Sequence, residues 1–131
     1  MPRMRGSNIG GRSGTTVEDV DGLVVSSQQR GGSVVVTVSG DLDIVTSPAL
    51  DDCLTKARAV GSQVVLDLSA VGFIDTSGIA VIVRHWKQLA AVSGDLALAG
   101  ARYQYTKTLW MTGLAARLKM YDNVEAALAA G

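Results

Sequence analysis

The sequence predicts an α/β fold, in which helices pack against a mixed β-sheet, and two observations point to it. Near the start of the chain, two runs rich in β-branched residues flank Gly31 and Gly32, a pattern typical of an antiparallel hairpin. Beyond them, strand-like apolar runs alternate with amphipathic helical runs, which is the pattern of parallel strands joined by helices. A sheet built from both parts contains both strand orientations.

The first half of the domain is predicted from local signals. Thr46 or Ser47 is suited to cap a helix whose first turn holds Pro48, where a missing N–H is harmless. Gly61 is the expected stop of that helix. The predicted elements before residue 62 are strands at 23–29 and 33–39 and a helix from about 47 to 60.

The second half continues the alternation. A turn is expected at 70–73, Gly94 is the expected end of the long amphipathic helix, and Asp122 or Asn123 is the expected cap of the last helix. The predicted elements after residue 62 are strands at 63–69, 95–100 and 118–121 and helices at 78–93, 106–114 and 123–131.

Length and charge indicate one domain with a protein partner. The chain has 131 residues, with 12 Lys and Arg balancing 12 Asp and Glu, so we expect no direct nucleic-acid contact. No apolar run approaches the length of a membrane span, and the N-terminus lacks the apolar region of a secretory signal, which predicts a cytoplasmic protein. Residues 1–20, rich in Gly, Ser and Arg, are predicted to be a flexible tail before a domain at 21–131.

The stretch FIDTSGIAVI, at 73–82, places Ser77 where a helix begins, and three interpretations compete. Ser77 is an ordinary first-turn residue if Asp75 or Thr76 caps the helix. A nucleophilic Ser77 requires a base, but His85, the only histidine, lies two helical turns away, roughly 12 Å. A phosphorylated Ser77 gains about −1.5 to −2 charges, which a helix N-terminus tolerates and a docked partner does not.

Other reactive groups suggest no catalytic or metal centre. Cys53 lies on an apolar helix face, which favours a buried thiol over a reactive one. Asp41, Asp43, Asp67 and Asp75 fall near strand ends, yet no histidine or cysteine has ligand spacing with them, so we expect no metal and no cofactor. The chain also lacks a P-loop or a GxGxxG motif after a strand.

Two longer motifs carry a family resemblance. GDLDIVTSPAL, at 40–50, followed by VVLDLSAVGFIDTSGIAVI, at 64–82, resembles the anti-sigma factor antagonists, also called anti-anti-sigma factors, and their STAS domain. The likeness covers about Leu23 to Ala130. It implies a STAS-type α/β fold with a mixed four- to five-stranded sheet and about four α-helices packed mainly on one face.

The resemblance also implies a non-enzymatic regulator. The family binds an anti-sigma factor that is also a serine protein kinase, and so releases a sigma factor. The kinase uses ATP to phosphorylate the serine that matches Ser77, a PP2C-like phosphatase reverses this, and Thr76 is a second acceptor candidate. Asp43 is expected to face a basic side chain, and Asp41 stands where glutamate is usual. The implied docking residues are Asp41, Asp43, Asp75, Thr76, Ser77, Gly78 and Ile79.

Two other functions remain open at this point. One is a STAS-like accessory subunit of a membrane lipid or anion transport system. The other is a small enzyme or weak nucleotide-binding module that uses the aspartates. A weak homodimer and the absence of direct membrane contact complete the expectations.

Overall fold

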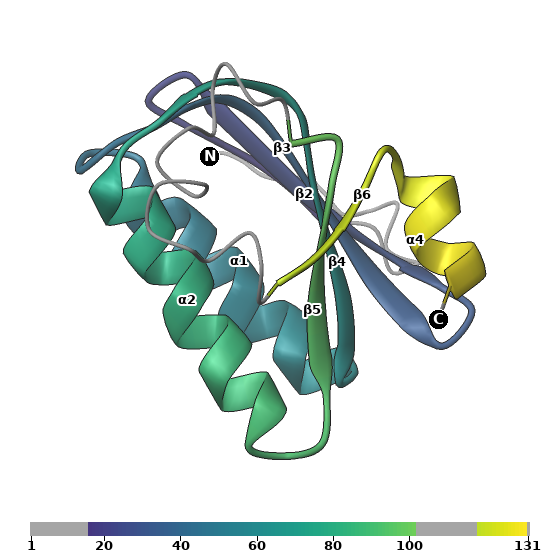
Figure 1. Cartoon of the computed structure of the whole chain (residues 1–131). Coiled ribbons are helices and arrows are strands. Elements are labelled where there is room, and N and C mark those ends of the chain that lie inside the picture. The colour runs from purple at the N-terminus through teal and green to yellow at the C-terminus, as the bar shows by residue number, and fades with distance from the viewer. Residues whose placement is uncertain (1–15, 102–117, 131) are drawn as a thin grey trace.

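The computed structural model describes residues 16–101 and 118–130, which form one six-stranded sheet with helices on both faces (Figure 1). The predicted helix at 106–114 lies outside the described residues. No helix in the described ranges is long and apolar enough to cross a membrane. The elements are β1 (Thr16–Val20), β2 (Leu23–Arg30), β3 (Ser33–Leu42), α1 (Ser47–Val60), β4 (Gln63–Ile74), α2 (Thr76–Ala90), β5 (Asp95–Ala99), β6 (Lys119–Tyr121) and α4 (Val124–Ala130).

The sheet is mixed, as predicted, and its strands lie side by side in chain order. Strands β1, β2 and β3 pair antiparallel, whereas β3 to β6 pair parallel. The parallel pairing of β3 with β4 and of β4 with β5 arises because α1 and α2 each return the chain to the same end of the sheet before the next strand. The described part therefore contains six strands where the resemblance implied four or five, and one more than the five predicted from local patterns.

The additional strand is β1, and it corrects the predicted boundary of the N-terminal tail. Residues 16–20, assigned to a flexible tail, pair with β2 through a two-residue turn in which Val20 lies opposite Leu23. Asp21 and Gly22 have φ angles of 53° and 83°, the positive values that a type I′ hairpin turn requires. The hairpin predicted at Gly31 and Gly32 is confirmed.

Strand β4 is longer than its sequence suggested. The turn predicted at 70–73 is wrong, because β3 continues beside this segment and pairs with it up to Leu42 and Ile74. Two register shifts, between Thr37 and Ser39 and between Gly40 and Asp41, let the two strands stay paired although β4 contains two extra residues. At the next boundary, α2 ends at Ala90, four residues before the predicted stop at Gly94.

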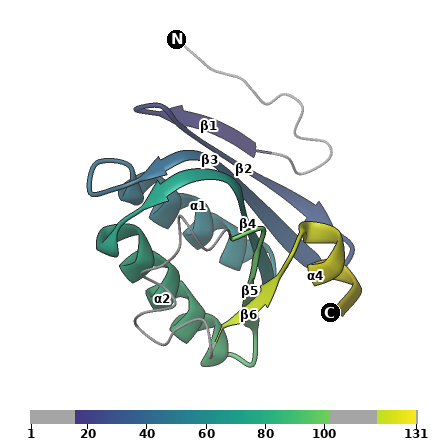
Figure 2. The same cartoon turned by 45° about the horizontal axis from the view of Figure 1, so that its top comes forward.

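The two faces of the sheet are covered unequally. Helices α1 and α2 lie together on one face over the main core, and α4 lies on the other (Figure 2). The main core buries residues such as Leu54 and Leu66 completely. Cys53 belongs to it, as predicted, and burial raises the pKa of its thiol to about 11. The smaller core under α4 contains Val35, Val65, Ala99 and Ala127.

A polar cluster around the buried His85 joins α1 to α2. His85 is 1% exposed. Arg58 Nε donates to His85 Nδ1 at 2.9 Å, so the neutral ring carries its hydrogen on Nε2 and donates it to Asp51 Oδ1 at 2.6 Å. Arg84 pairs with the other oxygen of Asp51 at 2.7 Å. The cluster ties the two helices together and leaves His85 no free nitrogen.

This cluster predicts a pH dependence of stability. Burial lowers the pKa of His85, so the unfolded chain binds a proton at a higher pH than the folded one. The free energy of unfolding should therefore decrease as pH falls through about 6.5, the usual histidine value, by at most about 1.4 kcal/mol per pH unit. Hydrogen bonds from His85 and Arg84 lower the pKa of Asp51, which therefore titrates below this window. Urea denaturation between pH 5 and pH 8 would measure the slope.

The matched variant is His85→Gln, because an amide can accept from Arg58 and donate to Asp51 but does not titrate in this range. We expect the slope near pH 6 to shrink in this variant. An unchanged slope would assign the pH dependence to other groups.

Candidate functional site

Ser77 lies in the first turn of α2, at the carboxyl end of β4, where the strand passes directly into the helix. The loop between β3 and α1 ends at the same edge of the sheet, so both helix N-termini lie there (Figure 1). A backbone hydrogen bond from Asp75 N to Leu42 O, at 3.0 Å, joins the two strand ends. In open α/β sheets, this edge is where binding sites usually form.

Asp75 is the helix cap, as one of the sequence interpretations held. Its Oδ1 atom accepts from the backbone N–H groups of Ser77 and Gly78 at 2.8 and 3.3 Å. It also accepts the hydroxyl hydrogen of Ser77, with the two oxygens 2.5 Å apart. These bonds, led by the one from the Ser77 side chain, lower the pKa of Asp75. Asp75 is therefore ionised at neutral pH, and it orients the Ser77 hydroxyl.

The start of α1 contacts the same hydroxyl. Ser47, the first residue of α1, is 4% exposed, and its Oγ lies 3.4 Å from Ser77 Oγ. Ser77 itself is half-buried. Gly78 lets the first turn of α2 approach the ends of β3 and β4 closely, because a Cβ there would lie 3.0 Å from atoms of both Leu42 and Ile74. The first turn of α2 thus packs directly on the strand ends.

The loop between β3 and α1 is organised by Asp43. Its Oδ1 atom accepts from the backbone N–H groups of Val45 and Thr46 at 2.9 and 3.0 Å. Thr46 is the N-cap of α1 by position, but its hydroxyl makes no capping bond to the helix and instead donates to Asp41 O at 2.7 Å. One oxygen of Asp43 is therefore used within the loop, a role that the sequence interpretation did not include.

Exposed apolar side chains lie at the same edge of the sheet as Ser77. Ile44 and Val45, in the loop, are 77% and 61% exposed, and Phe73, near the end of β4, is 50% exposed. We call Ile44, Val45, Phe73, Thr76 and Ser77 the Ser77 surface. Exposed apolar side chains at one edge are typical of a protein interaction site. The only sequence signal for them was an apolar pair inside a polar loop.

The predicted docking residues are not all available for contact. Thr76 and Asp41 are exposed and Asp75 is half-buried, at the same edge as Ser77. Ile79 is 6% exposed and packs in the main core, so its assignment to a docking surface is wrong for its side chain. Gly78 is also buried and acts through close packing.

The other candidate residues lie apart from this edge or are already bonded. Asp67 accepts from the hydroxyl of Ser69 at 2.7 Å and lies inside β4, whereas Asp75 follows the end of that strand. Within residues 16–101 and 118–130, no three potential metal ligands are grouped. His85 is bonded within the cluster between α1 and α2 and is not placed as a base for Ser77.

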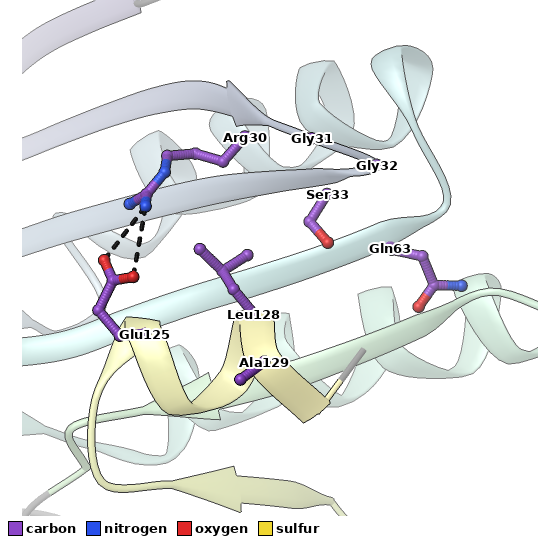
Figure 3. A pocket seen from close by; sticks show the side chains of 8 residues that line it. All are labelled: Arg30, Gly31, Gly32, Ser33, Gln63, Glu125, Leu128 and Ala129. Atoms are coloured by element: carbon purple, nitrogen blue, oxygen red, sulfur yellow. Dashed lines mark hydrogen bonds and ion pairs between the residues drawn. The ribbon is translucent and has the colours of Figure 1, made fainter.

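A shallow hollow of about 630 Å³ lies at the opposite end of the sheet, between the β2–β3 turn and α4 (Figure 3). Arg30 and Glu125 form an exposed ion pair at 3.1 Å on one side of it, so the guanidinium already has a carboxylate partner. The side chains of Ser33 and Gln63 lie further along it (Figure 3). Among the described residues that line the hollow, no polar side chain is fully buried in a way that would select a ligand.

Known proteins share this fold and sequence pattern. The sequence model of the STAS domain matches residues 25–127. The chain is 28% identical over 105 residues to the anti-sigma F factor antagonist of Paenibacillus polymyxa, covering 77% of this chain and 88% of that protein. It is 24% identical over 90 residues to the anti-sigma-B factor antagonist of Bacillus subtilis, covering 69% and 83%.

A solved structure agrees with the sequence comparisons. The crystal structure of an anti-sigma factor antagonist from Mycobacterium paratuberculosis has a TM-score of 0.76 and 27% sequence identity. The alignment covers 82% of this chain and 92% of that one. The STAS-type fold expected from the two motifs is therefore confirmed.

Proposed function

The chain belongs to the STAS domain family, and from that premise we propose that it is an anti-sigma factor antagonist that works by partner switching. In this proposal the unphosphorylated protein is a non-enzymatic cytoplasmic regulator that binds an anti-sigma factor, which is also a serine kinase. Binding releases the sigma factor. Phosphorylation of Ser77 ends binding, and a PP2C-like phosphatase restores it.

The observation that carries the proposal is the setting of the Ser77 hydroxyl. It is half-buried at a helix start that Asp75 caps, and the exposed apolar side chains of Ile44, Val45 and Phe73 share its edge of the sheet. A partner that covers these apolar groups also covers Ser77. The acidic side chains of Asp41, Asp43 and Asp75 at this edge favour a partner with basic residues.

A phosphate at Ser77 suits such a switch. The γ-phosphoryl group of ATP would be transferred to Ser77 Oγ, with ADP leaving and the hydroxyl proton released. The new group carries about −1.5 to −2 charges beside the carboxylate of Asp75. Exposed to water, these charges are tolerated at a helix start, whereas under a docked partner they must be desolvated. The partner is therefore repelled while the fold persists.

The test is a mixing experiment with purified candidate anti-sigma kinases and ATP, read by intact mass and by fragmentation of the product. We expect one phosphoryl group on Ser77 in the wild type and none in Ser77→Ala. Modification that persists in Ser77→Ala and disappears in Thr76→Val would make Thr76 the acceptor. No modification by any cognate kinase, together with co-purification with a membrane transporter, would contradict the proposal in favour of a transport subunit.

Asp43 provides a separate prediction about docking. Asp43→Lys removes the acceptor that organises the loop and reverses the charge, and we expect it to weaken the complex by roughly 1–3 kcal/mol. Asp43→Asn keeps a carbonyl oxygen in the place of Oδ1 and removes only the charge. Titration calorimetry on both variants separates the two roles. Weak binding by both indicates a charge contact, and full binding by Asp43→Asn alone indicates that the loop shape suffices. Unchanged affinity for Asp43→Lys would exclude Asp43 from docking.

A further inference from the structure

Ser47 is a buried polar residue whose position has no explanation in packing alone. Its side chain is 4% exposed at the start of α1. Among the residues that the structure describes, its hydroxyl has one hydrogen-bond partner, Ser77 Oγ at 3.4 Å. Alanine would fill the same space without a hydroxyl. Burying a hydroxyl is unfavourable unless it forms a hydrogen bond. The Ser47 hydroxyl therefore acts through its contact with Ser77.

The direction of the bond follows from the number of hydrogens. Ser77 has a single hydroxyl hydrogen, and it is given to the ionised carboxylate of Asp75. The hydrogen between the two serines must therefore belong to Ser47, whose hydroxyl donates to Ser77 Oγ. The result is a chain of donors that runs from Ser47 through Ser77 to Asp75.

Phosphorylation changes the two ends of this chain in opposite ways. As an ester oxygen, Ser77 Oγ carries no hydrogen, so its bond to Asp75 is lost and two negative groups face each other. Ser47 keeps its hydrogen and can donate to the ester oxygen or to a phosphate oxygen. The first backbone N–H groups of α1 do not compete for this role, because Ser47 N donates to Asp43 O, Ala49 N donates to Thr46 O, and Pro48 has none.

We propose that Ser47 is the positioning residue for the phosphorylated form: its hydroxyl donates to the phosphate on Ser77 and holds it against the start of α1, away from Asp75. This inference rests on the proposed phosphorylation of Ser77. It assigns to the first residue of α1 a task that becomes important only after the switch has acted.

The experiment uses the full chain with phosphoserine installed at position 77 during translation, so no kinase is needed. The probe is the phosphate itself, titrated through its second ionisation by ³¹P NMR. A donor to the phosphate favours the dianion, so Ser47→Ala should raise the pKa of this phosphate by about half a unit. Ser47→Thr, which restores a hydroxyl, should bring the titration back toward the wild-type curve. The matched control is Thr55→Ala, which removes an exposed hydroxyl from the same helix.

Ser47→Cys protects the test against poor folding of the alanine variant, because it keeps the side-chain size and has a weak donor. It should shift the pKa in the same direction by less. An unchanged or lowered pKa in both Ser47→Ala and Ser47→Cys would overturn the inference. The phosphate is installed without a kinase, so this test is independent of the kinase experiment. If the phosphate pKa shifts in these variants but no kinase modifies the wild type, only the proposed function is refuted.

Discussion

Ser77→Asp is expected to reduce the affinity of the protein for its anti-sigma factor by at least about a hundredfold, or roughly 2.7 kcal/mol. The new carboxylate lies next to that of Asp75 and shares its edge of the sheet with the exposed side chains of Ile44 and Phe73. A docked partner must desolvate it without compensation. The helix start tolerates the charge in water, so the melting temperature should stay within a few degrees.

Two control variants show whether the loss of affinity comes from the added charge, from the loss of the hydroxyl or from the position of the charge. Ser77→Ala removes the hydroxyl without adding charge, and we expect it to bind within a few-fold of wild type. Ser62→Asp adds the same charge at the other end of β4. The 12 residues of this strand span roughly 40 Å, so the variant should bind normally. Titration calorimetry and thermal melting measure both quantities. Equal affinities for Ser77→Asp and the wild type would refute the switch.

Gly40→Ala is expected to destabilise the fold by roughly 2–4 kcal/mol in urea denaturation. Gly40 has a φ of 119°, which L side chains rarely adopt, and a Cβ there would lie 2.8 Å from Gly22 O. The β1–β2 turn thus lies directly against β3 at this residue. The change would also disturb the strand end that leads to Asp41 and Asp43, so binding should weaken together with stability.

Two other glycines separate the contributions to that loss. Gly22 has a φ of 83°, but a Cβ added there would meet nothing within 4 Å, so Gly22→Ala should show only the conformational part, about 1 kcal/mol. Gly32 has neither constraint, and Gly32→Ala should change stability by less than about 0.5 kcal/mol. A loss in Gly40→Ala no larger than in Gly22→Ala would show that β3 moves to relieve the contact.

The parts of the fold that the sequence predicted are those with strong local signals. The hairpin at Gly31 and the helix cap at Asp75 depend on residues adjacent in the chain. Strand β1 had such a signal in Asp21 and Gly22, but the polar leader before it concealed a short edge strand. The end of β4 had none, because its extension up to Ile74 is imposed by pairing with β3.

The candidate site shows the same division. Asp75 and Ser77 could be predicted to interact because both belong to one helix start. The contact of Ser47 with Ser77 joins the starts of two helices, and no spacing in the sequence indicates it. The burial of His85 likewise depends on Asp51 and Arg58, which another helix supplies, so no local pattern indicates it.

The unequal cover of the sheet has a consequence for local unfolding. The α4 side is held by a small cluster around Val65 and Ala127 and by the exposed pair of Arg30 with Glu125. Such a unit opens at a lower free energy than the rest of a domain. We expect backbone amides of α4 to exchange with deuterium well before those of α2. The part of the molecule that carries Ser77 therefore stays protected from exchange while α4 unfolds locally.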